Sequence, residues 1–525
     1  MRRIRTYVAL VFAPLFWIAL CASLCADVRL PAVIGDHMVI QQDKPVAIWG
    51  WAGPGEKVTI GLAGLSREVR ATAEGKWQVA LDPLQPSAAP LELTVRGEKG
   101  PAIVARDILV GEVWLCSGQS NMEWPLQATL SPTPEILRAD HPQIRLFLVP
   151  KRTSDRPLDD IAAKWTQCAP ETAAPFSAVA YYFGLDLHQK LGVPVGLIES
   201  AWGGSDIEPW TPPSGFVAVP EVQSILAAHE ARYAEYRQAL KKALPSWGTW
   251  VRDTQKALAS NAVLPAMPAS GRLPENPYDT FKAPTTLYNA MIHSLTPFAI
   301  RGAIWYQGEN NRADGLSYEK KMQALIRGWR EAWRLGDFPF YYVQLAPYNY
   351  PFNNREAAPG DVPDQVLLPH IWEAQAKALR IPNTGMAVIS DIADLNDIHP
   401  RNKKDVGHRL ALWARARTYG EKDLVPSGPM YKSKVVEGGT VRIGFDYVGG
   451  GLIANDGLPL RWFEIAGDDH IFYRAAAEIA GESVVVRSAR VPDPKAVRFG
   501  WDQLAVPNLA NKAGLPASPF RTDNW

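Results

Sequence analysis

A serine followed by an asparagine stands directly after an apolar run of the sequence. Residues 118–122 read Gly-Gln-Ser-Asn-Met, and residues 112–116 before them are of the types that form a buried strand. Open α/β sheets bind their ligands at the carboxyl ends of strands, and a serine there becomes a nucleophile when a neighbouring base removes its proton. Ser120 is therefore a candidate nucleophile. The turn lacks the second glycine of the Gly-x-Ser-x-Gly elbow, which argues against an ordinary α/β-hydrolase.

A histidine beside a carboxylate follows a later apolar run. Residues 397–400 read Asp-Ile-His-Pro. A neutral imidazole accepts a proton near neutral pH, and an adjacent carboxylate can orient the ring and stabilise its cation. His399 is therefore the candidate general base, with Asp397 as the carboxylate beside it.

Two further loops carry donors suited to a developing negative charge. Residues 202–206 read Trp-Gly-Gly-Ser-Asp, and adjacent glycines allow a sharp turn that leaves amide N–H groups exposed. Residues 306–310 read Tyr-Gln-Gly-Glu-Asn, where Gln307 or Asn310 is placed to supply a side-chain amide. Each loop alone is compatible with an ordinary turn. Together, the four motifs at successive strand ends predict the parts of acyl transfer at one sheet edge.

The pattern of residues 107–424 predicts the sheet that must position these motifs. Apolar runs alternate with amphipathic stretches, which is typical of a three-layer α/β domain with crossover helices. A helix is expected over residues 317–334, and another after Pro400. The residues expected on the buried face of the second helix are Val406, Leu410 and Trp413. The expected strands are Glu112–Cys116, Val195–Glu199, Gly302–Gln307, Phe340–Leu345 and Met386–Ser390.

Short alternating apolar segments flank this α/β domain. Residues 27–106 predict an N-terminal β-sandwich, and residues 425–525 predict a C-terminal β-rich region. Between residues 212 and 283, a charged helical stretch at 229–244 is followed by a segment punctuated by proline and glycine. This interruption predicts an insertion that covers the sheet or shapes a site.

Residues 1–26 have the pattern of a secretory signal peptide. Arginines at positions 2, 3 and 5 precede an apolar run that ends at small residues near Ala26. We expect a secreted or periplasmic bacterial protein with no membrane insertion after cleavage; an uncleaved anchor is the alternative. Leucines before Cys21 and Cys25 argue against lipidation. After cleavage, Cys116 and Cys168 remain, as one disulfide or as two buried thiols.

The composition bounds the class of partner. The net charge is +1, so the chain has no electrostatic footprint for a polyanion, and nucleic acid is not an expected partner. The 19 tryptophans and 17 tyrosines mildly favour a carbohydrate, because aromatic faces can stack on sugar rings. No phosphate-cradling glycine loop and no His-Glu-x-x-His helix competes with an esterase. The oligomeric state has no signal in the sequence.

These motifs together resemble those of a known family. The sequence is similar to the sialate O-acetylesterase-like branch of the SGNH-hydrolase superfamily, over nearly the whole mature chain. The resemblance implies a flavodoxin-like three-layer SGNH-hydrolase domain with accessory β-structure, which hydrolyses O-acetyl esters on sugars without a metal or organic cofactor. The matching motifs, in the family's order, are residues 36–42, 118–122, 202–206, 287–292, 305–309, 397–400 and 514–523.

The resemblance also assigns roles to residues. It implies that Ser120 is the nucleophile and His399 the base, with oxyanion donors from the backbone of Ser120 and Gly204 and from the side chain of Gln307. One position departs from the pattern, because the superfamily places its acid three residues before the histidine, where this chain has Asn396. Asp397 is therefore the first candidate for the third member of the triad. The alternatives are Asp394, Asp391, Glu309 or a serine–histidine pair helped by a backbone carbonyl.

The sequence leaves two substrate classes open. These are acetylated plant polysaccharides, such as xyloglucan or xylan, and O-acetylated sialic acids. A sialate carboxylate favours a cationic partner, for which Arg312 is a candidate, beside Asn310 and Glu309 as further substrate contacts. The rival from another class is a non-catalytic carbohydrate-binding surface protein on an esterase scaffold, against which Ser120 and His399 argue. A peptidase or lipase using the same serine chemistry is a third alternative, and the lack of a long apolar lid-like segment disfavours the lipase.

Overall fold

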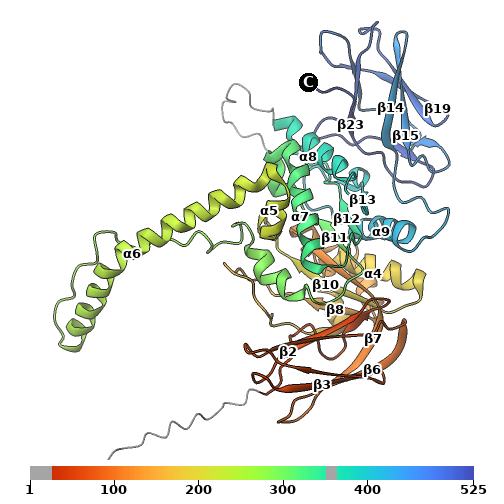
Figure 1. Cartoon of the computed structure of the whole chain (residues 1–525). Helices are drawn as coiled ribbons and strands as arrows, with labels where there is room; N and C mark the ends of the chain where they lie inside the picture. The colour runs from red at the N-terminus through yellow and green to blue at the C-terminus, as the bar shows by residue number, and fades with distance from the viewer. Residues whose placement is uncertain (1–26, 351–363) are drawn as a thin grey trace, which may run out of the picture.

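A mixed sheet runs through the centre of the molecule (Figure 1). The computed structural model describes residues 27–350 and 364–525, and the predicted signal peptide lies outside these ranges. The strand order is β13-β12-β11-β7-β10-β8-β9, and every neighbouring pair is parallel except β8 and β9. The strands are β7 Ile103–Gly118, β8 His141–Leu148, β9 Trp165–Cys168, β10 Val195–Ala201, β11 Gly302–Tyr306, β12 Phe340–Val343 and β13 Thr384–Ala387.

Helices cover both faces of this sheet. Every residue of β10, β11 and β12 is buried, as expected for parallel strands covered on both sides. Phe340 contacts Trp329 of α7 (Tyr318–Trp333), whereas the next residue, Tyr341, stacks on Trp413 of α9 (Lys403–Trp413). Successive residues of a strand point to opposite faces, so α7 and α9 lie on opposite sides. α4 (Ala178–Leu191) packs against α9, and α8 (Asp364–Ala378) packs against α7.

The expected central strands and helices are present, with shifted ends. The expected strand at 386–390 is β13, which ends at Ala387, and the helix expected over 317–334 is α7. Val406, Leu410 and Trp413 are buried on α9 as the spacing predicts. Taken in chain order, the strands β7, β10, β11, β12 and β13 lie in the order 2-1-3-4-5.

β7 joins the N-terminal β-structure to the central sheet. This 16-residue strand crosses position 106, where the composition changes along the sequence. Its first half pairs with β6 (Ser87–Arg96) and β1 (Val39–Gln41), and its second half pairs with β10 and β11. The remaining N-terminal strands are β2 Val46–Trp51, β3 Lys57–Leu62, β4 Leu65–Arg70 and β5 Lys76–Leu81. β7, which ends two residues before Ser120, is thus held by N-terminal strands along its first half and by the central sheet along its second half.

The C-terminal region forms further antiparallel sheets around its own core (Figure 1). Phe463, Ile465, Val484 and Phe499 are buried in that core. One sheet has the order β14-β15-β20-β19, another has the order β18-β17-β21-β23, and β16 pairs with β22. The strands are β14 Met430–Glu437, β15 Thr440–Asp446, β16 Leu452–Ala454, β17 Phe463–Ala466, β18 Tyr473–Arg474, β19 Ala476–Ala480, β20 Ser483–Arg487, β21 Ala496–Phe499, β22 Leu509–Asn511 and β23 Phe520–Arg521.

The predicted insertion forms a projecting arm (Figure 1). It contains α5 (Pro213–Ala218) and the 37-residue α6 (Gln223–Ala259). The expectation of irregular chain from Pro245 onward is wrong as far as Ala259, because α6 continues through the proline. A proline inside a helix leaves a carbonyl without its N–H partner. In α6 only two side chains are buried, so water can reach that carbonyl.

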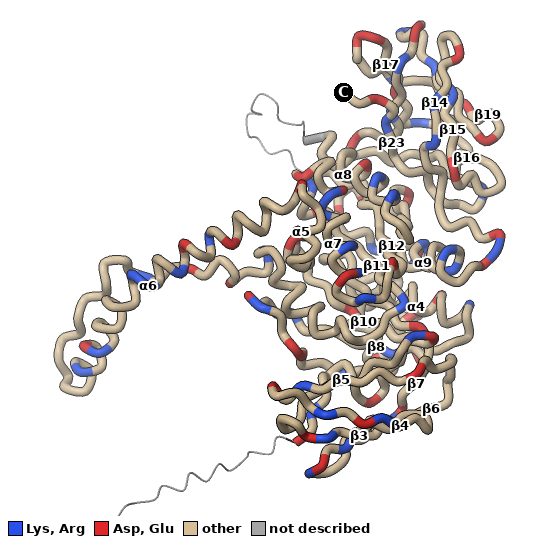
Figure 2. The backbone as a smooth tube through the Cα atoms, in the orientation of Figure 1, with Lys and Arg blue, Asp and Glu red and all other residues tan. Residues whose placement is uncertain are grey.

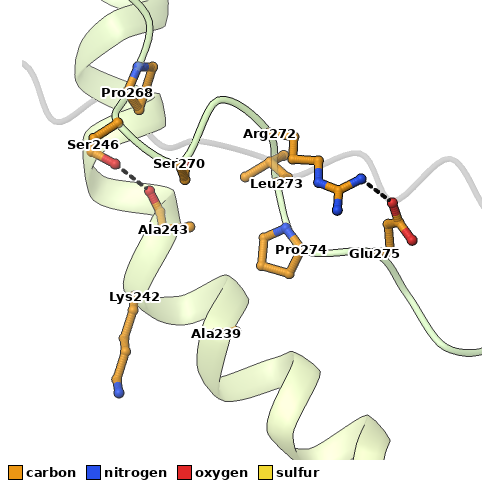
Figure 3. A pocket seen from close by; sticks show the side chains of 11 residues that line it. Ala239, Lys242, Ala243, Ser246, Pro268, Ser270, Arg272, Leu273, Pro274 and Glu275 are labelled. Atoms are coloured by element: carbon orange, nitrogen blue, oxygen red, sulfur yellow. Dashed lines mark hydrogen bonds and ion pairs between the residues drawn. The ribbon is translucent and has the colours of Figure 1, made fainter.

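A hollow lies toward the end of this arm (Figure 3). It measures about 700 Å³ and is lined by α6 between Ala239 and Ser246 and by residues 268–275. An ion pair of 2.7 Å between Arg272 and Glu275 crosses its rim, where both side chains are largely exposed. The hollow is distant from the central sheet and holds none of the residues that the sequence singles out.

Basic and acidic residues are interspersed along the chain, as Figure 2 shows, which agrees with a net charge of +1.

Cys116 and Cys168 are both free and buried. Of the two alternatives that the sequence leaves open, the structure therefore has two thiols. Burial raises the pKa of Cys168 to about 12, and it also raises that of Cys116. Within the described part of the chain, no helix is both long enough and apolar enough to cross a membrane.

Candidate active site

Ser120 and His399 meet at the carboxyl end of β7. Ser120 begins the short helix α1 (Ser120–Glu123), and Nε2 of His399 lies 2.9 Å from its Oγ. Gly118, which ends β7, has φ +147°, and a Cβ there would lie 2.1 Å from the carbonyl oxygen of Tyr306. Glycine is therefore required where β7 passes β11. The turn after Gly118 places the hydroxyl of Ser120 at the carboxyl edge of the sheet.

Three side chains surround the imidazole of His399. Its Nδ1 lies 3.6 Å from Oδ1 of Asp397, and the same oxygen accepts the backbone N–H of His399 at 2.9 Å. Trp124 stacks on the ring, with centroids 4.8 Å apart. Burial lowers the pKa of His399, the positive charge of Lys403 lowers it further, and Asp397 opposes both effects. His399 is therefore neutral at neutral pH and able to accept a proton from Ser120.

Asp397 is the carboxylate that faces the imidazole. Of the alternatives, Asp391 binds Arg409 through two contacts of 2.6 and 2.7 Å. Asp394 accepts the backbone N–H of Asn396 at 2.9 Å. The distance of 3.6 Å between Asp397 and His399 is an electrostatic contact and too long for a hydrogen bond.

A buried polar network lies directly behind the serine–histidine pair. Nδ2 of Asn121 donates to Oε1 of Glu309 at 2.5 Å and to the carbonyl oxygen of Ile398 at 3.1 Å. Nζ of Lys403, whose side chain is 0% exposed, donates to Oδ1 of Asn121. Burial lowers the pKa of Lys403 to about 7 and raises that of Glu309. The network ties the serine helix, the histidine loop and the loop after β11 to one another.

The loop after β10 lies against Ser120. A Cβ on Gly203 would lie 3.2 Å from Cβ of Ser120. The N–H of Gly203 donates to Oε2 of Glu123 at 2.7 Å, and Oε1 of Glu123 pairs with Nζ of Lys151 at 2.5 Å. Gly204 follows with φ +75°. Across residues 27–350 and 364–525, the backbone N–H groups of Ser120 and Gly204 have no hydrogen-bond acceptor, which leaves two donors beside the serine.

The sequence matches known carbohydrate esterases. A family model described as carbohydrate esterase, sialic acid-specific acetylesterase matches residues 276–412, which include the loop after β11 and His399. The sialate O-acetylesterase of Mus musculus is 30% identical over 445 residues, covering 77% of this chain and 76% of that protein. The Homo sapiens protein is 31% identical over 442 residues, covering 77% of this chain and 73% of that protein. The chain belongs to the sialate O-acetylesterase family.

A solved structure agrees with this membership. The carbohydrate acetylesterase of Xanthomonas citri aligns with a TM-score of 0.78 and 36% sequence identity, covering 95% of this chain and 100% of that one. This member of the sialate O-acetylesterase family is thus a carbohydrate O-acetylesterase with a mixed α/β fold, as its motifs predict.

Gln307 lies in a different setting from the one expected for this family member. Its side chain is 0% exposed, and Nε2 donates to the carbonyl oxygen of Ser205 at 3.1 Å and to Oδ1 of Asn311 at 2.7 Å. The hydroxyl of Tyr318 donates to Oε1 of Gln307 at 2.7 Å, which fixes the orientation of the amide. Both amide hydrogens are therefore engaged inside the protein, so the donation from Gln307 to an oxyanion stays a prediction that would require these hydrogen bonds to change.

The three residues expected to contact substrate have different surroundings. Asn310 is exposed, and its Nδ2 donates to the carbonyl oxygen of Gly204 at 2.7 Å and to Asp206 at 2.9 Å. Glu309 belongs to the buried network, and its Oε2 has no hydrogen-bond partner among the described residues. The guanidinium of Arg312 lies 4.3 Å from the ring of Tyr350. Asn310 therefore supports the Gly204 turn, whereas Glu309 supports Asn121.

Sequence reasoning missed the residues that support the site. Lys403 lies three residues before Val406 and shares the buried face of α9, so helical spacing alone could have marked it as a buried lysine. Glu123 and Trp124 lie three and four residues after Ser120, but no pattern in the sequence gives them a partner. Within the described ranges, no group of three or more His, Cys, Asp or Glu side chains is arranged to hold a metal ion.

The predicted insertion reaches the site at its carboxyl end. Phe281 stacks on Trp202, with ring centroids 5.1 Å apart and planes 10° apart. Trp202 precedes Gly203, which lies against Ser120, and Nζ of Lys151 lies 5.9 Å from the Trp202 ring. This family member therefore has an aromatic pair beside the Gly203–Gly204 loop.

Proposed function

We propose that this carbohydrate O-acetylesterase works as a serine esterase, through an acetyl-enzyme on Ser120. The observation that carries the proposal is the distance of 2.9 Å between Oγ of Ser120 and Nε2 of His399. A base within hydrogen-bond reach is what a serine needs to act as a nucleophile. The lowered pKa of His399 supports this, because a neutral imidazole can accept the proton.

The reaction then has two steps. Oγ of Ser120 attacks the acetyl carbonyl as its proton passes to Nε2 of His399, and the sugar oxygen leaves with that proton. Water next gives a proton to Nε2 and attacks the acetyl-enzyme, which releases acetate and restores the serine hydroxyl. Asp397 stabilises the imidazolium from 3.6 Å, a weaker support than a hydrogen bond gives.

The backbone N–H groups of Ser120 and Gly204 are the proposed oxyanion donors. Both lack an acceptor among the described residues, and Gly203 lies against Ser120. Glu123 and Asn310 hold the loop on either side, through the N–H of Gly203 and the carbonyl oxygen of Gly204. Preorganised donors of this kind stabilise the tetrahedral intermediate without moving during the reaction.

Acetylated plant polysaccharide, such as xyloglucan or xylan, is the first proposed substrate. The aromatic pair of Trp202 and Phe281 beside the serine loop supports a sugar ring at this position. O-acetylated sialic acid is the second, favoured by Arg312, whose buried Nη1 has no hydrogen-bond partner among the described residues. Such a guanidinium suits the carboxylate of a sialic acid.

The fold and the location of the enzyme complete the proposal. The strand order 2-1-3-4-5 in β7 and β10–β13, with helices on both faces, supports a flavodoxin-like SGNH-hydrolase domain. The accessory β-regions flank it. Residues 1–26 support export to the periplasm or beyond the cell.

Acetate release tests the proposal. The wild type is incubated with acetylated xyloglucan, acetylated xylan and an O-acetylated sialic acid, and the protein is analysed by intact mass spectrometry after rapid acid quench. We expect acetate from at least one glycan and a mass increase of one acetyl group mapped to Ser120. Binding to glycans without acetate release from any of them would instead favour the non-catalytic alternative, and the ranking of the glycans decides the substrate class.

A further inference from the structure

A second cavity lies in the C-terminal β-region. It measures about 570 Å³ and is bounded by β17, β18 and the loop at residues 501–504. Its lining includes Trp462, Glu464, Arg474 and Trp501. The volume falls within the range that small-molecule sites occupy in proteins.

Two charged side chains line this cavity without a direct hydrogen bond or ion pair in the described part of the chain. Glu464 and Arg474 face each other across β17 and β18, yet neither side chain forms a hydrogen bond or ion pair with any described residue. Arg498, the neighbour of Glu464 on β21, instead binds Asp523 through two contacts of 2.9 Å. Burial raises the pKa of Glu464, because its carboxylate has lost water without gaining a direct donor. A ligand hydroxyl would supply the donor that the half-buried Glu464 lacks, and another would take the place of water at the exposed Arg474.

The backbone of Trp462 is strained at the wall of the cavity. Its φ is +67°, a left-handed conformation that is unfavourable for a bulky side chain. The turn is held by the N–H of Gly500, which donates to the carbonyl oxygen of Trp462 at 2.9 Å. Strain of this kind gathers at binding sites, where it presents a side chain in a set orientation. Here the strained residue is Trp462, which lines the cavity.

The loop at residues 501–504 connects the cavity lining to the catalytic domain. Trp501 lies 5.9 Å from the ring of His370 on α8. Gln503, two residues later, donates to the carbonyl oxygen of Tyr350 at 3.1 Å, and Tyr350 underlies the guanidinium of Arg312. The cavity is thus joined through Tyr350 to the loop that follows β11, which also contributes Glu309 to the catalytic network.

We propose that this cavity binds a neutral sugar residue of a glycan chain, as an accessory site separate from the esterase centre. Indole faces stack on the C–H faces of sugars, while a carboxylate and a guanidinium pair with their hydroxyl groups. A neutral ligand fits because the lining has two carboxylates and two guanidinium groups, those of Glu464, Asp502, Arg461 and Arg474. The choice of ligand rests on the proposed polysaccharide substrate.

Titration calorimetry on the full chain tests the accessory site. The probes are xylohexaose and xyloglucan oligosaccharides from which alkali has removed the acetyl groups, so that binding does not depend on ester chemistry. Trp462→Gly keeps the left-handed backbone and removes the indole, and Glu464→Gln keeps the shape and removes the charge. We expect each variant to bind at least one probe about tenfold more weakly than the wild type.

A matched control and the opposing outcomes complete this experiment. Trp525→Ala removes a tryptophan that is 41% exposed in the same region but outside the cavity lining, and it should bind like the wild type. Circular dichroism verifies the fold of each variant. Equal affinity in the wild type and both cavity variants, or no binding of either probe by the wild type, overturns the proposal. If acetate release fails while binding still depends on Trp462, the accessory site stands and the serine mechanism falls.

Discussion

The buried ammonium group of Lys403 donates a hydrogen bond to Oδ1 of Asn121, the residue that follows Ser120. Lys403 comes from α9 and Asn121 from α1, so this contact joins two elements 282 positions apart in sequence. The positive charge also lowers the pKa of His399, after burial the second cause of that shift. We therefore infer that Lys403 is a positioning residue. It holds Asn121 in place and, together with burial, lowers the pKa of His399.

Replacing Lys403 should change the pH profile of the esterase. In Lys403→Met the positive charge is gone, so the pKa of His399 rises toward its ordinary value. Since activity needs neutral His399, the acid limb of kcat/KM should move to higher pH. The measurement is hydrolysis of 4-nitrophenyl acetate between pH 5 and pH 9. Lys404→Met, at the exposed neighbouring position, is the control and should leave the limb in place. An unshifted limb in the Lys403 variant would refute the coupling.

Asp397 should matter less than the aspartate of a tightly hydrogen-bonded triad. Its oxygen lies 3.6 Å from Nδ1 of His399 and its side chain is 31% exposed. For Asp397→Asn we expect kcat/KM to fall by roughly 10²-fold, whereas a buried, hydrogen-bonded triad aspartate contributes about 10⁴-fold. Steady-state kinetics on 4-nitrophenyl acetate measure the ratio. A loss as large as that of a serine variant would mean that Asp397 moves into hydrogen-bond contact during turnover.

Glu123 should affect catalysis through the loop of Gly203 and Gly204, which carries a proposed oxyanion donor. Its Oε2 accepts the N–H of Gly203 at 2.7 Å, directly beside Ser120. Glu123→Ala frees this loop, and we expect kcat to fall by roughly 10- to 10²-fold with a small change in KM, because the loop serves the transition state. Glu123→Gln keeps an acceptor and should recover much of the rate. If both variants were equally impaired, the charge and its pairing with Lys151 would be the cause.

Asp107 should stabilise the junction of the N-terminal strands with the central sheet. Burial alone would raise its pKa, but hydrogen bonds from Arg145, His37 and Gln167 bring it to about 2. A pKa below the unfolded value adds stability above about pH 3.8, and this stability is lost as the pH falls toward 2. The side chain is 25% exposed, and the shift corresponds to about 2 kcal/mol at pH 7.

Asp107→Asn checks this directly. Asparagine tolerates the φ of +57° at this position, so the backbone is kept. Urea unfolding should show a free energy of unfolding lower by about 2 kcal/mol at pH 7, with the difference narrowing at pH 3. Asp82→Asn removes a carboxylate that is 68% exposed and should change little. A difference that persisted unchanged at pH 3 would argue against an electrostatic origin.

The proximity of Ser120 and His399 could be predicted from the sequence because both residues follow strand ends. Residues 112–116 and 386–390 read as buried strands, and the carboxyl ends of parallel strands share one edge of a sheet. That rule alone brings Ser120 and His399 together, although 279 positions separate them. The order of the strands was not needed for this inference.

The support around this pair could not be predicted, because it depends on contacts between distant segments. Gln307 has the right side chain for an oxyanion donor, but Tyr318, Ser205 and Asn311 take up its hydrogen bonds. Lys403 reads as a surface lysine unless the partners Asn121 and Glu309 are known.

The ends of elements were missed for similar reasons. β7 continues across residue 106 because its first half pairs with N-terminal strands and its fully buried second half pairs with the central sheet, a change of partner that the sequence does not mark. α6 passes Pro245 because water reaches the helix there, which the sequence does not reveal.

Loss of activity in Ser120→Ala is the most direct test of the central claim. Ser117→Ala, at a buried hydroxyl three residues earlier whose Oγ has no partner among the described residues, is the matched control. Acetate release from 4-nitrophenyl acetate and from acetylated xyloglucan is measured for both variants, with folding verified by circular dichroism. We expect Ser120→Ala to lose at least about 10³-fold in kcat while Ser117→Ala retains most of it. A folded Ser120→Ala enzyme that still releases acetate at the wild-type rate would contradict the account.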